Sequence, residues 1–380
     1  DAFGKSIGDE RIGIYSPDNV RGFSPVDAGN LRIEGLYFDQ QAGPTSRLVE
    51  GNTVRVGISA QGYPFPAPTG IADYSLRKPG AEAVASLGLR YGPFGSRVAE
   101  ADLQLPLDGE RLGMIAGIGY YDETNIAGPQ PTFVSVALGA RYAPGAGVEI
   151  MPFWSRIYIR GEEAQPLIFT AGNFLPPRIS RTRFFGQKWA DFSGENDNYG
   201  LVAKGRLGAA EAQLGVFRSV SAGKEDHFDL LFGTDQAGSV ARRIVIAAGK
   251  NRFASTSGEL RLTRSFVDGV RSHTLVGSIK ARRQQRRYGG EDIAELGASV
   301  IGREDFRARP DFTIGEKTID KVSQAPFGIG YRGRWKDVGE VSLGLQKTDY
   351  RKRIREPDPA FSPPDSVSRP WLFNANASLF

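Results

Sequence analysis

The segment from residue 132 to residue 142 reads Thr132-Phe133-Val134-Ser135-Val136-Ala137-Leu138-Gly139-Ala140-Arg141-Tyr142. Apolar side chains occupy the even positions from Val134 to Tyr142, and small or polar residues occupy most of the positions between them. Successive side chains of a β-strand point to opposite faces of the sheet. This period of two therefore predicts a strand with one apolar face and one small or polar face.

The same period recurs along most of the chain after residue 80. It is clearest at residues 98–105, 327–336 and 341–346, and we count about 15 such segments, separated by turns that contain Gly or Pro. Almost no helical period competes with it. The sequence therefore predicts an all-β protein built from antiparallel strands.

The two faces of these segments favour a membrane barrel over a soluble β-protein. A soluble sandwich would present mostly Val, Ile, Leu and Phe on its inner face, whereas here the second face often carries Gly, Arg, Glu, Gln or Ser. An apolar outer face with aromatic ends and a polar interior is typical of a transmembrane outer-membrane β-barrel. The aromatic residues at the ends of segments are Tyr120, Tyr142, Tyr331, Trp335 and Tyr350.

The composition excludes several classes of function. The 380 residues contain no Cys and only two isolated His, His227 and His273, which leaves little material for metal or nucleophile chemistry. We expect no catalytic residue, no metal ligand and no cofactor, and we do not expect an enzyme. Lys and Arg total 48 against 43 Asp and Glu, and the charges are interspersed, so no nucleic-acid partner is expected. No run of 18 apolar residues is present, which excludes a transmembrane helix.

Long polar segments alternate with short turns along the chain. Outer-membrane barrels place short turns on the periplasmic side and long loops outside, so the long segments predict a ligand vestibule over one mouth of the barrel. They are residues 160–166, 173–198, 282–293, 302–324 and 351–370. The sequence opens without a recognisable signal peptide, so we expect a protein that is either cytosolic or supplied in mature, processed form.

The first eighty residues are different, because they are rich in Gly, Pro and Asp and contain short ordered motifs in place of alternation. These motifs are Val20-Arg21-Gly22-Phe23, Leu31-Arg32-Ile33-Glu34-Gly35-Leu36-Tyr37, Val54-Arg55-Val56-Gly57 and Pro68-Thr69-Gly70-Ile71-Ala72-Asp73-Tyr74. In this order, ahead of a large barrel, they resemble the plug domain of TonB-dependent outer-membrane receptors. Glu34-Gly35 stands where that family usually has Asp-Gly.

The resemblance implies a domain organisation and a function. Residues 1–80 would form a plug domain, and residues 81–380 would supply the strands of the barrel whose lumen the plug fills. The protein would take up a small scarce ligand, such as a siderophore-iron complex or another small organic nutrient, across the outer membrane of a Gram-negative bacterium. The TonB-ExbB-ExbD complex would supply the energy.

The resemblance also implies the site. The plug loops would contact the ligand, and polar contacts would hold the plug against the lumen wall. Arg32 and Glu34 are the expected plug–barrel ion pairs, with wall charges such as Glu100, Asp102, Arg332 and Arg334 as partners. The residues expected at the ligand are Arg21, Phe23, Tyr37, Phe38, Gln40, Gln41 and Arg47.

Two basic clusters need a separate interpretation. The run from Lys280 to Tyr288 is expected to carry a strand into an external loop, and Arg351-Lys352-Arg353 reads the same way. Cations near the outer leaflet can pair with the phosphates of lipopolysaccharide. We therefore expect outer-membrane lipid and lipopolysaccharide as partners of these clusters.

The C-terminal segment bears on closure of the barrel. Trp371, Phe373 and Leu379 share the apolar parity, whereas Phe380 has the other parity, although closing strands usually end in an outward-facing aromatic residue. Plugged barrels have about 22 strands, so the chain would supply about 14 to 16 of them and a second chain could supply the rest. The alternative is a passive porin of about 16 strands with an N-terminal constriction.

Overall fold

The computed structural model describes residues 5–6, 25–26, 28–55, 63, 65, 70–145 and 147–379. These residues form one large, mainly antiparallel sheet of 16 strands and one small sheet of five strands. The predicted all-β fold class is confirmed. Within the described ranges, no helix is long and apolar enough to cross a membrane.

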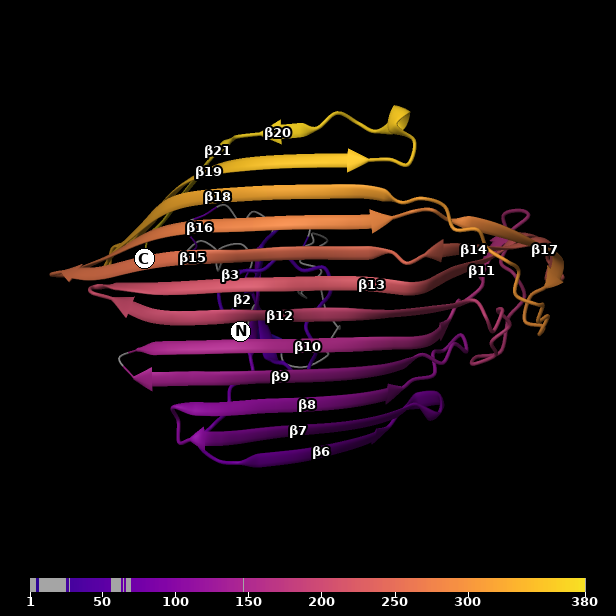
Figure 1. The fold of residues 1–380 in the computed structure, drawn as a ribbon, viewed down its shortest axis with the longest axis horizontal. Helices are drawn as coiled ribbons and strands as arrows, with labels where there is room; N and C mark the ends of the chain where they lie inside the picture. Colours follow the sequence, from indigo (N-terminus) through magenta and orange to yellow (C-terminus); the bar gives the residue numbers. More distant parts are fainter. Residues whose placement is uncertain are drawn as a thin grey trace.

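The large sheet follows the order of the chain, with most neighbouring strands joined by short turns (Figure 1). Its strands are β6 (Val84–Tyr91), β7 (Arg97–Asp108), β8 (Leu112–Asp122), β9 (Thr132–Gly145), β10 (Val148–Glu163), β11 (Leu167–Thr170), β12 (Asp191–Leu207), β13 (Ala210–Thr234), β14 (Ser239–Gly249), β15 (Arg252–Asp268), β16 (Arg271–Tyr288), β17 (Asp292–Val300), β18 (Thr318–Trp335), β19 (Gly339–Arg355), β20 (Ser366–Ser368) and β21 (Trp371–Leu379).

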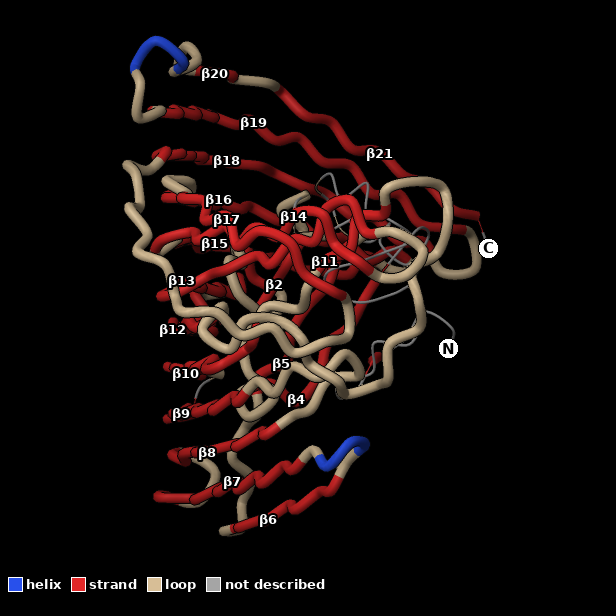
Figure 2. The backbone as a smooth tube through the Cα atoms, turned by 90° about the vertical axis from the view of Figure 1, so that its right-hand side faces the viewer, coloured by secondary structure: helices blue, strands red, loops and turns tan. Residues whose placement is uncertain are grey.

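The sheet curves into an open arc, with β6 at one end and β20 and β21 at the other (Figure 2). The alternation predicted for β9 is confirmed, because Ser135 and Ala137 are buried on the concave face whereas Leu138 and Tyr142 are exposed on the convex face. The convex face of β18 likewise exposes Phe327. Each strand therefore presents small or polar side chains to the concavity and apolar ones to the outside.

The small sheet lies on the concave side of the arc (Figure 2). Its strands are β1 (Lys5–Ser6), β2 (Leu31–Ile33), β3 (Leu36–Tyr37), β4 (Val49–Arg55) and β5 (Ile71–Leu76), in the order β1-β4-β5-β2-β3. Glu34 and Gly35 connect β2 to β3 with φ angles of 51° and 81°, the left-handed conformation that a two-residue hairpin turn requires. Segment 77–83 joins the two sheets, and the predicted boundary at residue 80 lies within it.

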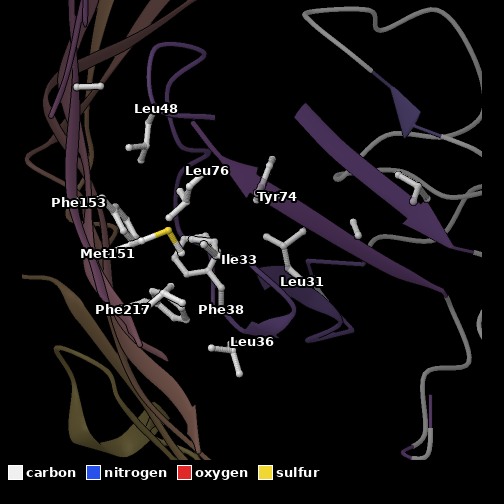
Figure 3. Packing of buried hydrophobic residues seen from close by; sticks show 14 residues of the cluster. Leu31, Ile33, Leu36, Phe38, Leu48, Tyr74, Leu76, Met151, Phe153 and Phe217 are labelled. Carbon is white, nitrogen blue, oxygen red and sulfur yellow. The ribbon is translucent and has the colours of Figure 1, made fainter. Parts of the chain in front are cut away.

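One apolar cluster joins the two sheets (Figure 3). Ile33, Leu36 and Phe38 of the small sheet and its margin face Phe153 and Phe217 of the large sheet. All five side chains are buried. Burial of each such side chain contributes about 1.5–3 kcal/mol to stability. The small sheet is therefore held by apolar packing against the concave face of the large sheet, which we call the wall.

One part of the large sheet lies at the strand ends where the long connections gather (Figure 1). We call it the loop-end sheet; it consists of β11, the second half of β13, β14 and β17. The five predicted loop segments are all too long, because strands occupy part of each. β10 ends at Glu163, β12 begins at Asp191, β16 ends at Tyr288, β18 begins at Thr318 and β19 ends at Arg355. Lys280–Tyr288 is thus entirely strand.

Candidate functional site

Residues 34–47, which we call the docking segment, leave β2 and run along the concave face of the large sheet. Three alternate backbone N–H groups of this segment donate to side-chain oxygens of the wall. The pairs are Tyr37 N–H to Glu259 Oε2 (3.0 Å), Asp39 N–H to Ser257 Oγ (2.9 Å) and Gln41 N–H to Ser219 Oγ (2.9 Å). The wall uses side chains because β13 and β15 already have strand partners on both sides.

The negative charges of the two carboxylates in this docking contact, Glu259 and Asp39, are neutralised by neighbouring donors. Glu259 also accepts from Arg261 Nη2 (2.7 Å) and from Ser278 Oγ (2.7 Å). Asp39 accepts from Arg282 Nη1 (3.1 Å). Buried charges are tolerated when they are paired and hydrogen-bonded, so these contacts hold the segment in register without an uncompensated charge.

Ion pairs hold both ends of the docking segment. Glu34 lies 2.9 Å from Lys204 Nζ on β12 and 3.3 Å from Lys78 Nζ. Arg47 lies 2.5 Å from Asp102 and 3.1 Å from Glu100, both on β7. Burial acts to raise the pKa of Glu34, but the Lys204 hydrogen bond and charge, followed by the Leu76 N–H, hold that pKa below its ordinary value.

The lowered pKa of Glu34 predicts a pH-dependent attachment. A carboxylate whose folded-state pKa is depressed contributes stability above its unfolded pKa and loses that contribution as pH falls through the folded value. We expect Glu34→Gln to lower the thermal stability of the docked state at pH 7, by roughly 1–3 kcal/mol. The difference from wild type should shrink below pH 4.5 and vanish once Glu34 is protonated, as thermal unfolding at several pH values would measure. An equal difference at every pH would contradict this assignment.

Two glycines of the wall, Gly117 and Gly328, leave space for side chains of the first eighty residues. A Cβ at Gly117 would lie 2.9 Å from Cβ of Arg47, and one at Gly328 would lie 2.5 Å from Cε1 of Phe65. Both separations are shorter than a normal contact. Phe38, in the centre, packs edge-on against Phe217 with ring centroids 5.7 Å apart.

Tyr63 forms a separate polar centre between the sheets. Its hydroxyl accepts from Arg32 Nη2 (2.9 Å) and from Lys280 Nζ (3.0 Å). Burial acts to raise the pKa of Tyr63, but the positive charges of Arg32 and Lys280 hold it below its ordinary value. Arg32 therefore donates to a tyrosine hydroxyl within the first eighty residues. Among the described residues, no ion pair joins Arg32 to a carboxylate of the wall.

Five of the seven residues predicted at the ligand lie in the docking segment, where their described contacts are with the large sheet or with neighbouring residues. Arg21 and Phe23 lie outside the described residues. Tyr37 and Phe38 are buried against the wall, and Arg47 forms wall ion pairs with Glu100 and Asp102. Gln40 accepts from the Tyr74 hydroxyl (3.1 Å), and Gln41 contributes its N–H to the docking contact.

The wall residues that accept hydrogen bonds from the docking segment were not predicted from the sequence. Ser219, Ser257 and Glu259 belong to the polar parity of β13 and β15, which was the available signal, but the period does not say which of these residues meets the plug. Asn198 on β12 was also missed; its Nδ2 donates to the carbonyls of Ala42 and Gly43, both at 3.1 Å.

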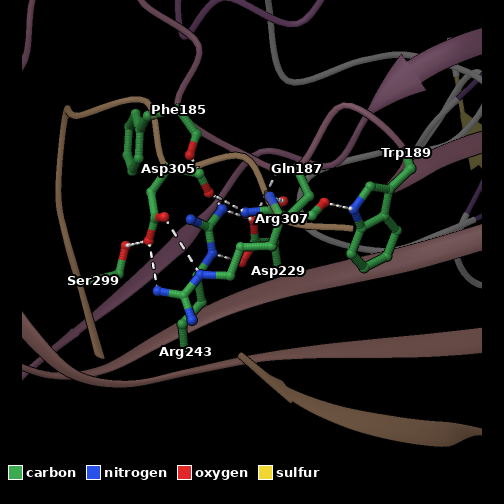
Figure 4. A network of polar contacts seen from close by, with 8 residues as sticks. All are labelled: Phe185, Gln187, Trp189, Asp229, Arg243, Ser299, Asp305 and Arg307. Carbon is green, nitrogen blue, oxygen red and sulfur yellow. Dashed lines mark hydrogen bonds and ion pairs between the residues drawn. The ribbon is translucent and has the colours of Figure 1, made fainter. Parts of the chain in front are cut away.

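A polar clasp joins two long loops to the loop-end sheet (Figure 4). Arg243 and Asp229 form a fully buried ion pair, and Arg243 Nη2 also donates to the Phe185 carbonyl (3.1 Å). Gln187 donates to the Asp305 carbonyl (2.7 Å) and accepts from the Arg307 N–H (2.8 Å). Loops that precede β12 and β18 are therefore fixed to one another through the clasp.

We expect Arg243→Met to open the clasp, because it leaves the Asp229 carboxylate buried and unpaired. Breaking a buried pair in this way costs about 3–5 kcal/mol. Limited proteolysis should cut near residues 185–189 and 305–307 many times faster than in wild type. The control is Arg242→Met, because Arg242 is half exposed and pairs with Glu295 at 3.1 Å. Equal protection in the two variants would show that the ion pair does not hold the loops.

A cavity of about 560 Å³ lies beside the clasp. Its walls include His227 and Phe312, whose rings lie 5.9 Å apart and each pack near Trp189. Four cations and two carboxylates also line it: Lys224, Lys250, Arg309, Lys317, Glu225 and Asp311. Such a combination suits a ligand with anionic groups and flat apolar surface.

Comparisons with known proteins find no matching family model and no matching curated sequence. Solved structures do match. BauA, the ferric preacinetobactin receptor from Acinetobacter baumannii, has a TM-score of 0.73 and 14% identity over 95% of this chain and 54% of BauA. The siderophore receptor PiuA of the same organism has a TM-score of 0.76 and 11% identity over 99% of this chain and 58% of PiuA.

The ferripyoverdine receptor of the Pseudomonas aeruginosa outer membrane is similar as well, with a TM-score of 0.75 and 14% identity over 94% of this chain and 49% of the receptor. The chain thus spans about half the length of the structures it matches. The fold is that of an outer-membrane receptor with a plug and a β-barrel wall. More narrowly, it is the fold of the TonB-dependent siderophore receptors, so the predicted resemblance is confirmed at the level of the fold.

Proposed function

We propose that this protein takes part in the active uptake of a small, scarce ligand across the outer membrane of a Gram-negative bacterium, with energy from the TonB-ExbB-ExbD complex. The observation that carries the proposal is the docking segment. It holds a small sheet in the concavity through side-chain contacts and ion pairs, and no strand of the small sheet is hydrogen-bonded into the large sheet within the described residues. Such a plug can detach from the large sheet without breaking the strand pairing of either sheet.

The convex face supports the membrane location. Leu138, Phe327 and Ile329 are exposed on it, and Tyr142 and Trp371 are exposed near strand ends. Apolar residues bounded by aromatic residues are what the lipid-facing surface of an outer-membrane barrel requires.

The cavity beside the clasp and the similar receptors support a proposed ligand class. A ferric siderophore, or another small organic nutrient with anionic groups, would match the four cations and the aromatic wall of the cavity. We propose that the ligand is carried unchanged and that the protein is not an enzyme.

Uptake assays on the protein in its own outer membrane test the proposal. A deletion strain should lose accumulation of one radiolabelled iron chelate or nutrient from a panel, and the wild type should lose it when an uncoupler collapses the proton gradient. Accumulation that persists in the uncoupled wild type would overturn active uptake and favour the passive porin. The porin is otherwise disfavoured, because the concavity is occupied by a packed small sheet.

A further inference from the structure

The Tyr63 side chain connects a cation of the small sheet to a cation of the wall. Its hydroxyl oxygen lies 2.9 Å from Arg32 Nη2 on β2 and 3.0 Å from Lys280 Nζ on β16. The centre of its ring lies 5.2 Å from the Arg32 guanidinium, 5.4 Å from Lys280 Nζ and 5.9 Å from the guanidinium of Arg261 on β15. Positive groups from three strands therefore surround one phenol.

Contacts that do not involve the hydroxyl group hold Tyr63 in this position. Asn374 Nδ2 on β21 donates to the Tyr63 carbonyl (3.2 Å). The ring of Phe65 packs edge-on against the Tyr63 ring, with centroids 5.7 Å apart, and lies over Gly328 of the wall. The substitution Tyr63→Phe should therefore remove the hydroxyl and leave the aromatic ring in place.

Arg32 and Lys280 have no carboxylate partner among the described residues. Both are buried, with 2% and 8% of their surface exposed, and neither forms an ion pair in that part of the chain. Arg32 Nε is buried there without a hydrogen-bond partner. Glu259, whose charge also acts on Arg32, is already paired with Arg261 (2.7 Å). Buried cations without a counter-charge are strongly unfavourable, so the arrangement lacks a negative charge.

The sum of the nearby charges gives the size of this deficit. Three cations face two carboxylates, one of which, Asp73, accepts the Gly35 N–H (2.9 Å) and lies on β5. An ionised Tyr63 would bring the sum to zero. The titratable and charged groups that face Tyr63 or its two cations are Arg32, Tyr37 and Asp73 of the small sheet and Glu259, Arg261 and Lys280 of the wall.

We propose that Tyr63 links docking of the plug to protonation: the phenol is ionised while the plug is docked, and it takes up a proton from water when the plug leaves the wall. The phenolate joins the two sheets because it accepts charge-assisted hydrogen bonds from Arg32 and Lys280. On undocking, Arg32 leaves with the plug whereas Lys280 stays on the wall, so the phenolate loses the charges that stabilise it. The proposal rests on these contacts, and it does not depend on transport or on the transported ligand.

The pH dependence of docking follows from this proton exchange. The positive charges of Arg32 and Lys280 outweigh burial and hold the pKa of Tyr63 below its ordinary value in the docked state. Docking therefore becomes more favourable as pH rises between the docked and undocked pKa values of Tyr63, by about tenfold per pH unit. The gain is complete above the ordinary tyrosine pKa of about 10 and is lost as pH falls through the docked value. Glu34 acts in the acid range, so the two effects are separable.

Titration of the ultraviolet absorbance of tyrosinate tests the ionisation, on protein extracted from its native outer membrane in mild detergent. One of the 13 tyrosines of this sequence should ionise at a lower pH than the others. Tyr63→Phe should abolish this early component, and Lys280→Met should move it to higher pH. The control is Tyr91→Phe, because Tyr91 is exposed on β6 and should leave the early component unchanged. Absence of an early component in the wild type, or its persistence in Tyr63→Phe, would overturn the proposal.

Amide hydrogen exchange of the docking segment tests the link to docking. The exchange rates of the Tyr37, Asp39 and Gln41 N–H groups in Tyr63→Phe are divided by the wild-type rates at the same pH, which cancels the intrinsic effect of pH on exchange. This ratio should rise about tenfold or more from pH 7 to pH 9, because only the wild type gains a phenolate. An equal ratio at both pH values would refute the proton link, even if the variant docks less tightly at each pH. Uptake assays are a separate measurement, so this failure would leave the transport proposal intact.

Discussion

Oxidation of the double variant Ala42→Cys/Ser219→Cys is expected to stop ligand uptake, and reduction is expected to restore it. The Ala42 backbone N lies 3.2 Å from Ser219 Oγ, so the two residues are in contact and a disulfide between these positions would tie the docking segment to the wall. The chain has no Cys of its own, and the introduced pair therefore cannot exchange with another thiol of this sequence. Uptake of the oxidised form should fall below about one-tenth of the reduced form, because a covalent bond does not yield to the forces that separate polar contacts.

The matched control places a disulfide where the plug is not involved. Ser265 and Thr274 are directly opposite on β15 and β16, with hydroxyl oxygens 3.1 Å apart. Ser265→Cys/Thr274→Cys therefore joins two wall strands that are already paired, and its oxidation should leave uptake unchanged. Wild-type uptake by the oxidised Ala42/Ser219 variant would show that the docking segment stays on the wall during transport.

The faces of the strands could be predicted from sequence because they depend only on local alternation. In β9, the parity of Val134 and Leu138 was sufficient to place Ala137 in the concavity. Strand pairing could not be predicted in the same way. β13 runs without interruption from Ala210 to Thr234, yet its first half pairs with β12 and β15 and its second half with β14 and β11. Nothing in its period marks where it changes partners.

The contacts of the candidate site were harder to predict, because the residues that contact one another are far apart in the sequence. Gln41 and Ser219 are separated by 178 positions, and Asp39 and Ser257 by 218. Only the fold brings them together. An aromatic residue such as Phe38 can face either a ligand or a wall, and the decisive neighbour, Phe217, lies in a strand whose register the sequence does not specify.

The basic run shows how one motif can serve two surfaces. Read as a charge cluster, residues 280–288 predict a loop or a lipid contact. As a strand, they alternate, so that Arg282 pairs with Asp39 on the concave face while Arg283 lies on the convex face. The period was present in the sequence, but six charged or amide side chains in succession hide it, because hydropathy no longer distinguishes the two faces.

The unpaired edges of the large sheet determine whether the chain can insert into a membrane by itself. In the described part of the chain, β6 pairs only with β7, and β21 only with β19, so each has an outer edge without a strand partner. All eight residues of β6 are exposed. In the hydrocarbon region each unpaired backbone group costs several kcal/mol, which is why sheets that span a membrane are closed. Both edges therefore need strands to pair with when the sheet is in lipid.

We accordingly expect the 380-residue chain, produced alone and refolded with lipid vesicles, to remain sensitive to protease and to migrate alike on gels with and without heating. Addition of a polypeptide that carries complementary strands for β6 and β21 should give a protected, heat-resistant complex. The control is the same polypeptide with prolines in its pairing strands, which removes the backbone N–H groups that the edges require. A heat-modifiable, inserted monomer of 41.3 kDa formed by the chain alone would refute this expectation, since β6 and β21 would then have to pair with each other and close a smaller barrel around the docked plug.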